Sequence, residues 1–244
     1  IVSSELRNIE LEGYDRYTLA NIIITEWLKD YKNLKLPSVA DSIINYYYYS
    51  GKIPESDYLK DLIKKNLFTK NFEDRIRNKL GEVLKGEYSF SKIVIDDRTQ
   101  SSTEKVKYFN SPQVCGVKLY GEIENVFFNE TNIVSVRYKR IGNNKDNLKT
   151  TFDTVYLGVF LSALAYVKND IKATIIYIDE DSNMALLFLS PIDRKDFESL
   201  ITYYREKNNF DLLPLEIVSN LSSCKKDEVL KEIIKKVEDE YSYF

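Results

Sequence analysis

Histidine is absent from this chain of 244 residues, and cysteine occurs only at Cys115 and Cys224. The absence of histidine excludes Ser-His-Asp and Cys-His catalysis, histidine metal ligation and histidine-based pH sensing. Two cysteines that are far apart and outside any CxxC pattern are too few ligands for a structural zinc site. They could form a disulfide, but we favour two reduced thiols in a cytoplasmic protein.

Long apolar runs and a strong charge imbalance are also lacking. No run approaches the roughly 20 apolar residues that span a bilayer. The net charge is only −3, from 35 basic and 38 acidic side chains. A protein that coats a DNA duplex usually has a strongly basic balance, so any contact with nucleic acid must be local. The start, Ile1-Val2-Ser3, has neither an initiator Met nor a signal-peptide pattern, so we expect a piece of a longer protein.

The spacing of apolar residues divides the chain into three segments. Residues 1–87 are predicted to be helical, with Pro37 and Pro54 beginning helices and Gly86 ending one. Residues 88–210 are predicted to form an α/β core, with strands at 88–95, 117–124, 133–140, 173–178 and 185–189 and helices at 149–168 and 193–206. Residues 211–244 are predicted to be a C-terminal helical tail, with helices at 214–222 and 226–241. We expect one compact α/β domain overall, with a mixed sheet flanked by helices.

Two of the predicted strands carry a pattern with specific chemistry. Strand 117–124 contains Gly121-Glu122-Ile123-Glu124, and strand 133–140 contains Arg137-Tyr138-Lys139. An α-β-β-β-α-β order is typical of restriction-endonuclease-like nucleases, the PD-(D/E)XK fold. In the RecB-like branch of that fold one strand carries roughly Gly-x-Ile-Asp and the next carries Asp-Tyr-Lys. In that fold two acids hold Mg²⁺, and the lysine helps to activate the attacking water.

The chain departs from that pattern at the second acid. Glu124 keeps the first acid in type, whereas Arg137 stands where the second acid should be. A guanidinium about 4 Å from a divalent ion opposes it by several kcal/mol at an effective dielectric of roughly 20. We therefore predict a degenerate nuclease site at Glu124, Arg137 and Lys139, with no catalytic residues, metal or other cofactor, in which a Glu124–Arg137 ion pair replaces the metal. The alternative is that Arg137 is a solvated residue of an edge strand.

Four segments, in order along the chain, resemble the C-terminal domain of the RecC family, the gamma subunits of exodeoxyribonuclease V. They are residues 11–17, 119–124, 136–139 with the basic loop that follows, and Tyr204-Arg205-Glu206 with Leu213-Pro214-Leu215. The resemblance implies a domain similar to the RecB nuclease that lacks its active site, and so is not an enzyme by itself. It also implies a RecBCD-type helicase–nuclease that processes double-strand ends in DNA repair and recombination. RecB-like and RecD-like subunits and forked or single-stranded DNA would be the partners, and the RecC region that carries Chi recognition is not in this segment.

The basic stretch 137–149 supplies the candidate DNA-binding residues Arg140, Lys145 and Lys149, which could contact a phosphate backbone or an acidic partner surface. A solvated loop is the alternative. Tyr46 to Tyr49 could stack on unpaired bases, although a packed helix is the simpler prediction. Two other functions stay open. An active nuclease could use Glu122 and Glu124 with Asp153 as an unorthodox second acid, and a pure protein-interaction module would have no contact with nucleic acid.

Overall fold

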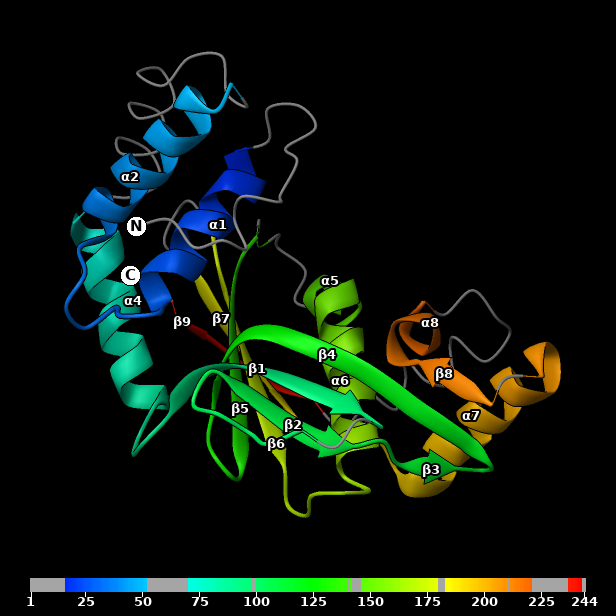
Figure 1. Ribbon diagram of the computed structural model, residues 1–244. Helices are drawn as coiled ribbons and strands as arrows, with labels where there is room; N and C mark the ends of the chain where they lie inside the picture. Colours follow the sequence, from blue (N-terminus) through cyan, green and yellow to red (C-terminus); the bar gives the residue numbers. More distant parts are fainter. Residues whose placement is uncertain are drawn as a thin grey trace.

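A mixed β-sheet with helices on both of its faces organises the protein (Figure 1). The computed structural model describes residues 16–51, 70–97, 100–139, 141, 146–179, 183–209, 211–220 and 237–242. Its strands are β1 (Ser89–Asp96), β2 (Val106–Asn110), β3 (Gln113–Val114), β4 (Val117–Phe128), β5 (Asn132–Tyr138), β6 (Lys172–Ile178), β7 (Met184–Leu189), β8 (Leu212–Pro214) and β9 (Val237–Ser242). Its helices are α1 (Arg16–Leu28), α2 (Leu36–Tyr49), α4 (Lys70–Val83), α5 (Asp146–Lys149), α6 (Phe152–Leu164), α7 (Arg194–Asn208) and α8 (Leu215–Ser219). The predicted α/β class, with a mixed sheet flanked by helices, is confirmed.

The strands follow the order β2-β1-β4-β5-β6-β7-β9, and the short strands β3 and β8 both pair with β4. Strand β4 is antiparallel to both of its long neighbours, β1 and β5, whereas β5 and β6 are parallel. Parallel neighbours need a crossover connection, and helix α6 lies in the connection between β5 and β6. Strand β7 then returns antiparallel to β6. The end of β5 therefore leads directly into the crossover helix.

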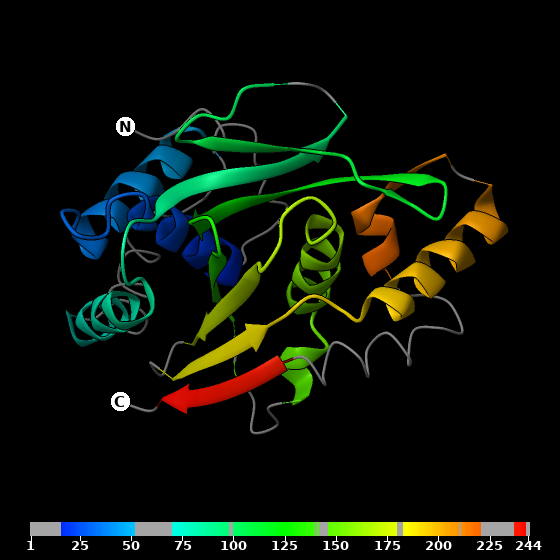
Figure 2. The same cartoon turned by 90° about the horizontal axis from the view of Figure 1, so that it is seen from below.

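Each face of the sheet is covered by its own group of helices (Figures 1 and 2). Helices α1, α2 and α4 bury one core, in which Trp27 and Phe72 pack with Val136 and Tyr138 of β5. Helices α6, α7 and α8 bury a second core against the other face, and Ile133 of β5 belongs to it. Because side chains alternate along a strand, β5 contributes to both cores.

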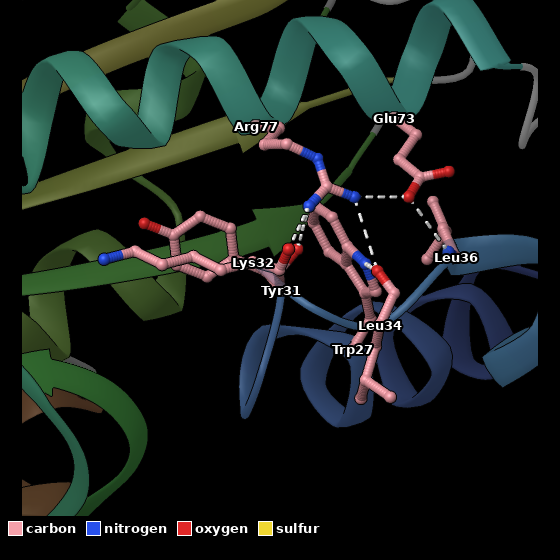
Figure 3. Close-up of polar contacts among 7 residues, drawn as sticks. All are labelled: Trp27, Tyr31, Lys32, Leu34, Leu36, Glu73 and Arg77. Carbon is pink, nitrogen blue, oxygen red and sulfur yellow. Dashed lines mark hydrogen bonds and ion pairs between the residues drawn. The ribbon is translucent and has the colours of Figure 1, made fainter.

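Arg77 of α4 fixes the loop between α1 and α2 (Figure 3). Its guanidinium donates hydrogen bonds to the carboxylate of Glu73 and to three loop carbonyl oxygens, those of Tyr31, Lys32 and Leu34. It also lies 5.6 Å from the ring centroid of Trp27, and Glu73 accepts a 3.2 Å hydrogen bond from the backbone N–H of Leu36, where α2 begins. These bonds pair carbonyl groups that the turn of the chain leaves outside any helix or strand.

Most of the predicted elements are present at the predicted places. The helix predicted at 15–31 is α1, and the one begun by Pro37 is α2, which ends just before Ser50 and Gly51. The strands predicted at 88–95, 117–124 and 133–140 are β1, β4 and β5. The helix predicted at 149–168 is α6, and the short helix α5 precedes it. The helix that Pro54 was predicted to begin lies outside the described residues.

The predicted C-terminal helix at 226–241 is wrong over its described part. Residues 237–242 form strand β9, which pairs antiparallel with β7 from Met184↔Ser242 to Leu189↔Val237. Val237 and Tyr241 are four residues apart, which is about one helical turn and also two strand repeats, so the pattern fits both structures. Without residues 237–242, one side of β7 would have unpaired backbone N–H and C=O groups. Hydrogen bonds to these groups favour a strand over a helix at 237–242.

Candidate functional site

Strands β4 and β5 pair over a short stretch only and then separate (Figure 1). Their backbone pairing runs from Phe128↔Ile133 to Val126↔Ser135. Beyond that point β4 continues beside β1, while β5 continues beside β6 as far as Tyr138. A pocket of about 130 Å³ lies where they separate, and α6 contributes to its wall. Its lining includes Glu122, Glu124, Ser135, Arg137, Asp153 and Tyr156. Glu124 and Arg137 of the predicted degenerate site therefore line one pocket.

A β-bulge at Asn125 changes which face of β4 its side chains occupy. Ser91 pairs with Val126 and Ile93 pairs with Ile123, so Lys92 of β1 lies opposite two residues of β4. Asn125 has a φ of 57°, in the left-handed region that asparagine tolerates better than most residues. Ile123 and Val126 consequently face the same core, the one under α6, although they are three residues apart. Strand alternation places Glu122 and Glu124, which flank Ile123, on the opposite face.

Lys92 is the partner of both glutamates. Its Nζ lies 2.8 Å from Oε2 of Glu122 and 3.2 Å from Oε1 of Glu124. Burial by itself would lower the pKa of Lys92, but the hydrogen bonds and the negative charges of the two carboxylates outweigh it and raise the pKa above 10.5. The ammonium group thus lies between two acids in the position that a bound cation would take.

The predicted Glu124–Arg137 ion pair is wrong. Within the described part of the chain, Glu124 pairs with Lys92, and the one hydrogen bond of the Arg137 side chain is a long 3.4 Å contact from Nη1 to the carbonyl oxygen of Val136. The bulge at Asn125 is the physical reason. It places the Glu124 carboxylate on one face of the sheet, while alternation places Arg137 on the face of Ile133 and Ser135, toward α6.

Lys139, the third residue of the predicted site, is exposed at the end of β5, outside the residues that line the pocket. Its backbone N–H donates a 2.9 Å hydrogen bond to the carbonyl oxygen of Ile178 and extends the pairing of β5 with β6. Of the predicted DNA-binding residues, Arg140 and Lys145 lie outside the described residues. Lys149 is the last residue of α5 and is partly buried. The DNA-binding role of this stretch stays a prediction.

Tyr156 of α6 connects the crossover helix to β4. Its hydroxyl donates a 2.6 Å hydrogen bond to the backbone carbonyl oxygen of Glu122. Burial raises the pKa of Tyr156 to about 12, with smaller contributions from the charges of Glu216 and Glu122, while the hydrogen bond to the Glu122 backbone lowers it. This close approach depends on Gly121, since a Cβ there would lie 3.1 Å from the Tyr156 hydroxyl and 3.2 Å from Leu215. The glycine of the Gly-x-Ile-acid motif therefore has a packing function.

A group of hydroxyls stabilises the start of α6. Thr151 caps the helix by accepting a hydrogen bond from the backbone N–H of Thr154. The hydroxyl of Tyr177 lies 2.8 Å from that of Thr151 and 2.9 Å from that of Thr154. Burial is the main cause that raises the pKa of Tyr177, and the nearby charges of Asp153 and Arg137 act on it in opposite directions. Asp153 and Arg137 are thus close enough to Tyr177 to influence one buried hydroxyl.

The acids near this pocket do not form a carboxylate cluster. Among the described residues, no group of three histidine, cysteine, aspartate or glutamate side chains could hold a metal ion together. Glu122 and Glu124 share Lys92, while Asp153 lines the pocket beside α6. Lys92 was not identified from the sequence, although a lysine beside the Ile93-Val94-Ile95 run of a central strand is a signal that could have indicated a buried partner.

Comparisons with known proteins give no match: no family model, no curated protein and no solved structure matches this chain. Within the described ranges, no helix is both long enough and apolar enough to cross a membrane.

Proposed function

We propose that this chain is a non-catalytic, restriction-endonuclease-like domain that resembles the C-terminal domain of RecC. The order of its elements supports this proposal. With the short strands β2 and β3 and helix α5 set aside, the chain runs α4, β1, β4, β5, α6, β6, which is an α-β-β-β-α-β order. The two strands that carry the motifs, β4 and β5, are neighbours, and a pocket lies where they separate.

The observation that carries the proposal is the charge arrangement at the motif residues. A nuclease of this class needs two acids that share a divalent cation. Here the ammonium of Lys92 lies within 3.2 Å of both glutamates of β4, and a guanidinium, that of Arg137, stands where the second acid would be. A divalent cation at the two glutamates would have to displace Lys92, and on the other face of the sheet the pocket presents a permanent positive charge in place of a second acid.

The proposed role is to scaffold a RecBCD-type helicase–nuclease and to guide DNA strands in double-strand break repair and recombination, together with RecB-like and RecD-like subunits. A fold that keeps the nuclease framework without its metal would contribute surfaces and strand contacts rather than chemistry. The resemblance of the motifs supports these partners, and Lys139 with the basic stretch that follows it would contribute to the DNA contact.

A nuclease assay tests the loss of catalysis. The chain would be incubated with duplex, forked and single-stranded DNA in the presence of Mg²⁺ or Mn²⁺. We expect no metal-dependent cleavage by the wild-type chain and an identical result for Glu124→Gln. Cleavage that Glu124→Gln or Asp153→Asn abolishes would establish the active-nuclease alternative instead.

Co-expression tests the partners. We expect the chain to elute with RecB-like and RecD-like subunits from the same source in size-exclusion chromatography, and the assembly to survive Glu124→Gln. Elution of the chain apart from both subunits would contradict the proposed complex. If the chain also lacked salt-dependent binding to forked DNA, the protein-interaction alternative would take its place.

A further inference from the structure

The pocket between β4 and β5 contains an arginine whose hydrogen-bonding capacity is mostly unused. A guanidinium has five N–H donors. Arg137 makes one long hydrogen bond in the described part of the chain and no ion pair there with Glu122, Glu124 or Asp153. An arginine with free donors at a pocket wall is suited to bind an oxyanion, because its fork geometry matches two oxygens of a phosphate or carboxylate.

Ser135 is a second polar residue of the pocket wall. The residue is only 3% exposed, it lines the same pocket, and strand alternation places it on the face of Arg137. Its hydroxyl can donate one hydrogen bond to an oxygen of a ligand that Arg137 binds.

The size of the pocket limits what can enter it. Its volume of about 130 Å³ is below the roughly 300–1,000 Å³ of pockets that enclose a drug-sized ligand. A pocket of this size suits one small charged group, such as a phosphate, with the rest of a larger ligand outside it.

An aromatic surface lies next to the pocket. Tyr156 lines it, and the ring of Phe152 stacks on Tyr156 with centroids 5.8 Å apart and planes 17° apart. Phe152 is 53% exposed, at the first position of α6. Large exposed aromatic rings beside a cationic group are typical of single-strand nucleic-acid sites, where bases stack on the ring and the phosphate meets the charge.

The neighbouring charges select the form of the phosphate. Lys92 offsets the charges of Glu122 and Glu124, whose carboxylates lie on the other face of the sheet, and Asp153 lines the pocket with Arg137. The charge of Glu216 also reaches Tyr156 in the pocket wall. One arginine among these acids tolerates the single negative charge of a phosphodiester better than the double charge of a terminal phosphate.

We infer that this pocket binds one internal phosphodiester of single-stranded DNA, with the phosphate at Arg137 and Ser135 and an adjacent base stacked on Phe152. The choice of DNA rests on the proposed function, whereas the phosphodiester and the stacked base follow from the pocket itself. In this proposal Arg137 binds the phosphate of a DNA strand that the domain does not cleave.

Fluorescence anisotropy with a labelled single-stranded oligonucleotide tests this site in the full chain. We expect Arg137→Gln to weaken binding about tenfold and to reduce the slope of log K against log salt by about 0.7, the value for one phosphate contact on a single strand. Phe152→Ala should weaken binding about 5- to 150-fold without changing that slope. Lys105→Gln changes an exposed charge elsewhere, and this variant should bind like the wild type.

Modified oligonucleotides test the phosphate directly. A strand with uncharged methylphosphonate linkages should bind the wild-type chain at least as weakly as the natural strand binds Arg137→Gln, and Ser135→Ala should weaken binding in the same direction. Circular dichroism of each variant would check that it is folded, and Phe152, being exposed, can be changed without loss of core packing.

Three results would overturn the inference: no binding by the wild-type chain, equal effects of Arg137→Gln and Lys105→Gln, or equal binding of duplex DNA with no effect of Phe152→Ala. These failures are distinguishable from failure of the proposed function. Metal-dependent cleavage would contradict the non-catalytic role whatever the oligonucleotide does, whereas a chain that assembles with its partners but ignores Arg137→Gln would lose only the strand site.

Discussion

The ammonium group of Lys92 lies 3.2 Å from the carboxylate of Glu124, a residue whose motif alone would pair it with Arg137. The two residues meet because Lys92 lies opposite the bulge at Asn125, where β4 has one residue more than β1. The bulge turns Glu124 to the face of Lys92 and leaves Arg137 on the other face, free to contact a ligand. One extra residue in one strand thus separates two charges that the linear motif places together.

Replacement of Lys92 by methionine should restore an affinity for divalent cations. The change leaves two carboxylates side by side without their cation, which is a favourable ligand set for Mn²⁺ or Mg²⁺. The melting temperature of Lys92→Met should therefore rise when Mn²⁺ is added, by about 2–4 °C for each ~1 kcal/mol of binding. The wild-type chain and the double variant Lys92→Met with Glu124→Gln should show no such rise, and an equal rise in all three would refute the role given to Lys92.

The backbone at Asn125 should tolerate glycine and resist alanine. The left-handed backbone conformation of Asn125 destabilises a residue with a Cβ by about 1–2 kcal/mol. The penalty is smaller for asparagine and absent for glycine. We expect Asn125→Ala to lower the free energy of unfolding by about 1 kcal/mol and Asn125→Gly to change it little. Urea denaturation measures both, and an alanine variant as stable as the glycine variant would argue against the bulge.

Two glycines should respond oppositely to alanine. At Gly121 a methyl group would meet the Tyr156 hydroxyl at 3.1 Å and Leu215 at 3.2 Å, so Gly121→Ala should destabilise the protein by about 1–3 kcal/mol. Gly81 lies within α4 with nothing within 4 Å of such a methyl group, so Gly81→Ala should stabilise by about 0.5–1 kcal/mol. Equal responses of the two variants in thermal melting would contradict this packing.

The hydroxyl of Tyr156 should make stability depend on pH in the alkaline range. Its pKa is about 12 in the folded protein and near 10 in an unfolded chain. A pKa raised by folding contributes stability that is complete below pH 10 and is lost as the pH rises through 12. Tyr156→Phe removes the hydrogen bond to the Glu122 carbonyl oxygen and should lower the free energy of unfolding by about 1 kcal/mol at neutral pH. Above pH 10 the free energy of unfolding of this variant should fall less steeply than that of the wild type.

Folding also raises the pKa of Lys92, so loss of its proton lowers the free energy of unfolding as the pH rises above 10.5. This decrease occurs in the wild type and in Tyr156→Phe alike. The comparison is therefore between Tyr156→Phe and the wild type at each pH, measured by urea denaturation. Parallel curves for the two proteins between pH 9 and 12 would count against the Tyr156 contribution.

Arg77 should be irreplaceable by lysine. Its guanidinium donates hydrogen bonds to the carboxylate of Glu73 and to three loop carbonyl oxygens at the same time (Figure 3). A lysine ammonium lacks the planar array of donors that allows all four bonds. We expect Arg77→Lys to lower the free energy of unfolding by about 2 kcal/mol. The exposed Lys118–Asp97 pair is the control, since Lys118→Ala should cost less than about 0.5 kcal/mol. Equal costs would show that the Arg77 network adds little.

The sequence alone determined the elements whose periodicity is local. The apolar spacing that predicted α1, α2 and the strands β1, β4 and β5 depends on contacts within each segment and on which face is buried. Alternation along β5 puts Arg137 and Val136 on opposite faces of the sheet, and in the structure Val136 lies in the core under α1, α2 and α4 while Arg137 lines the pocket. These properties depend only on residues that are close in the sequence, so they can be predicted without the rest of the chain.

Only the tertiary structure decided how those elements meet. The bulge at Asn125 is a relation between β4 and β1, and neither strand reveals it by itself. The described end of the tail became strand β9 because the edge of β7 offered backbone partners, although Val237 and Tyr241 fit a helix equally well. Glu124 pairs with Lys92 and not with Arg137. The face that its side chain occupies depends on the extra residue that β4 has relative to β1, and not on β4 alone.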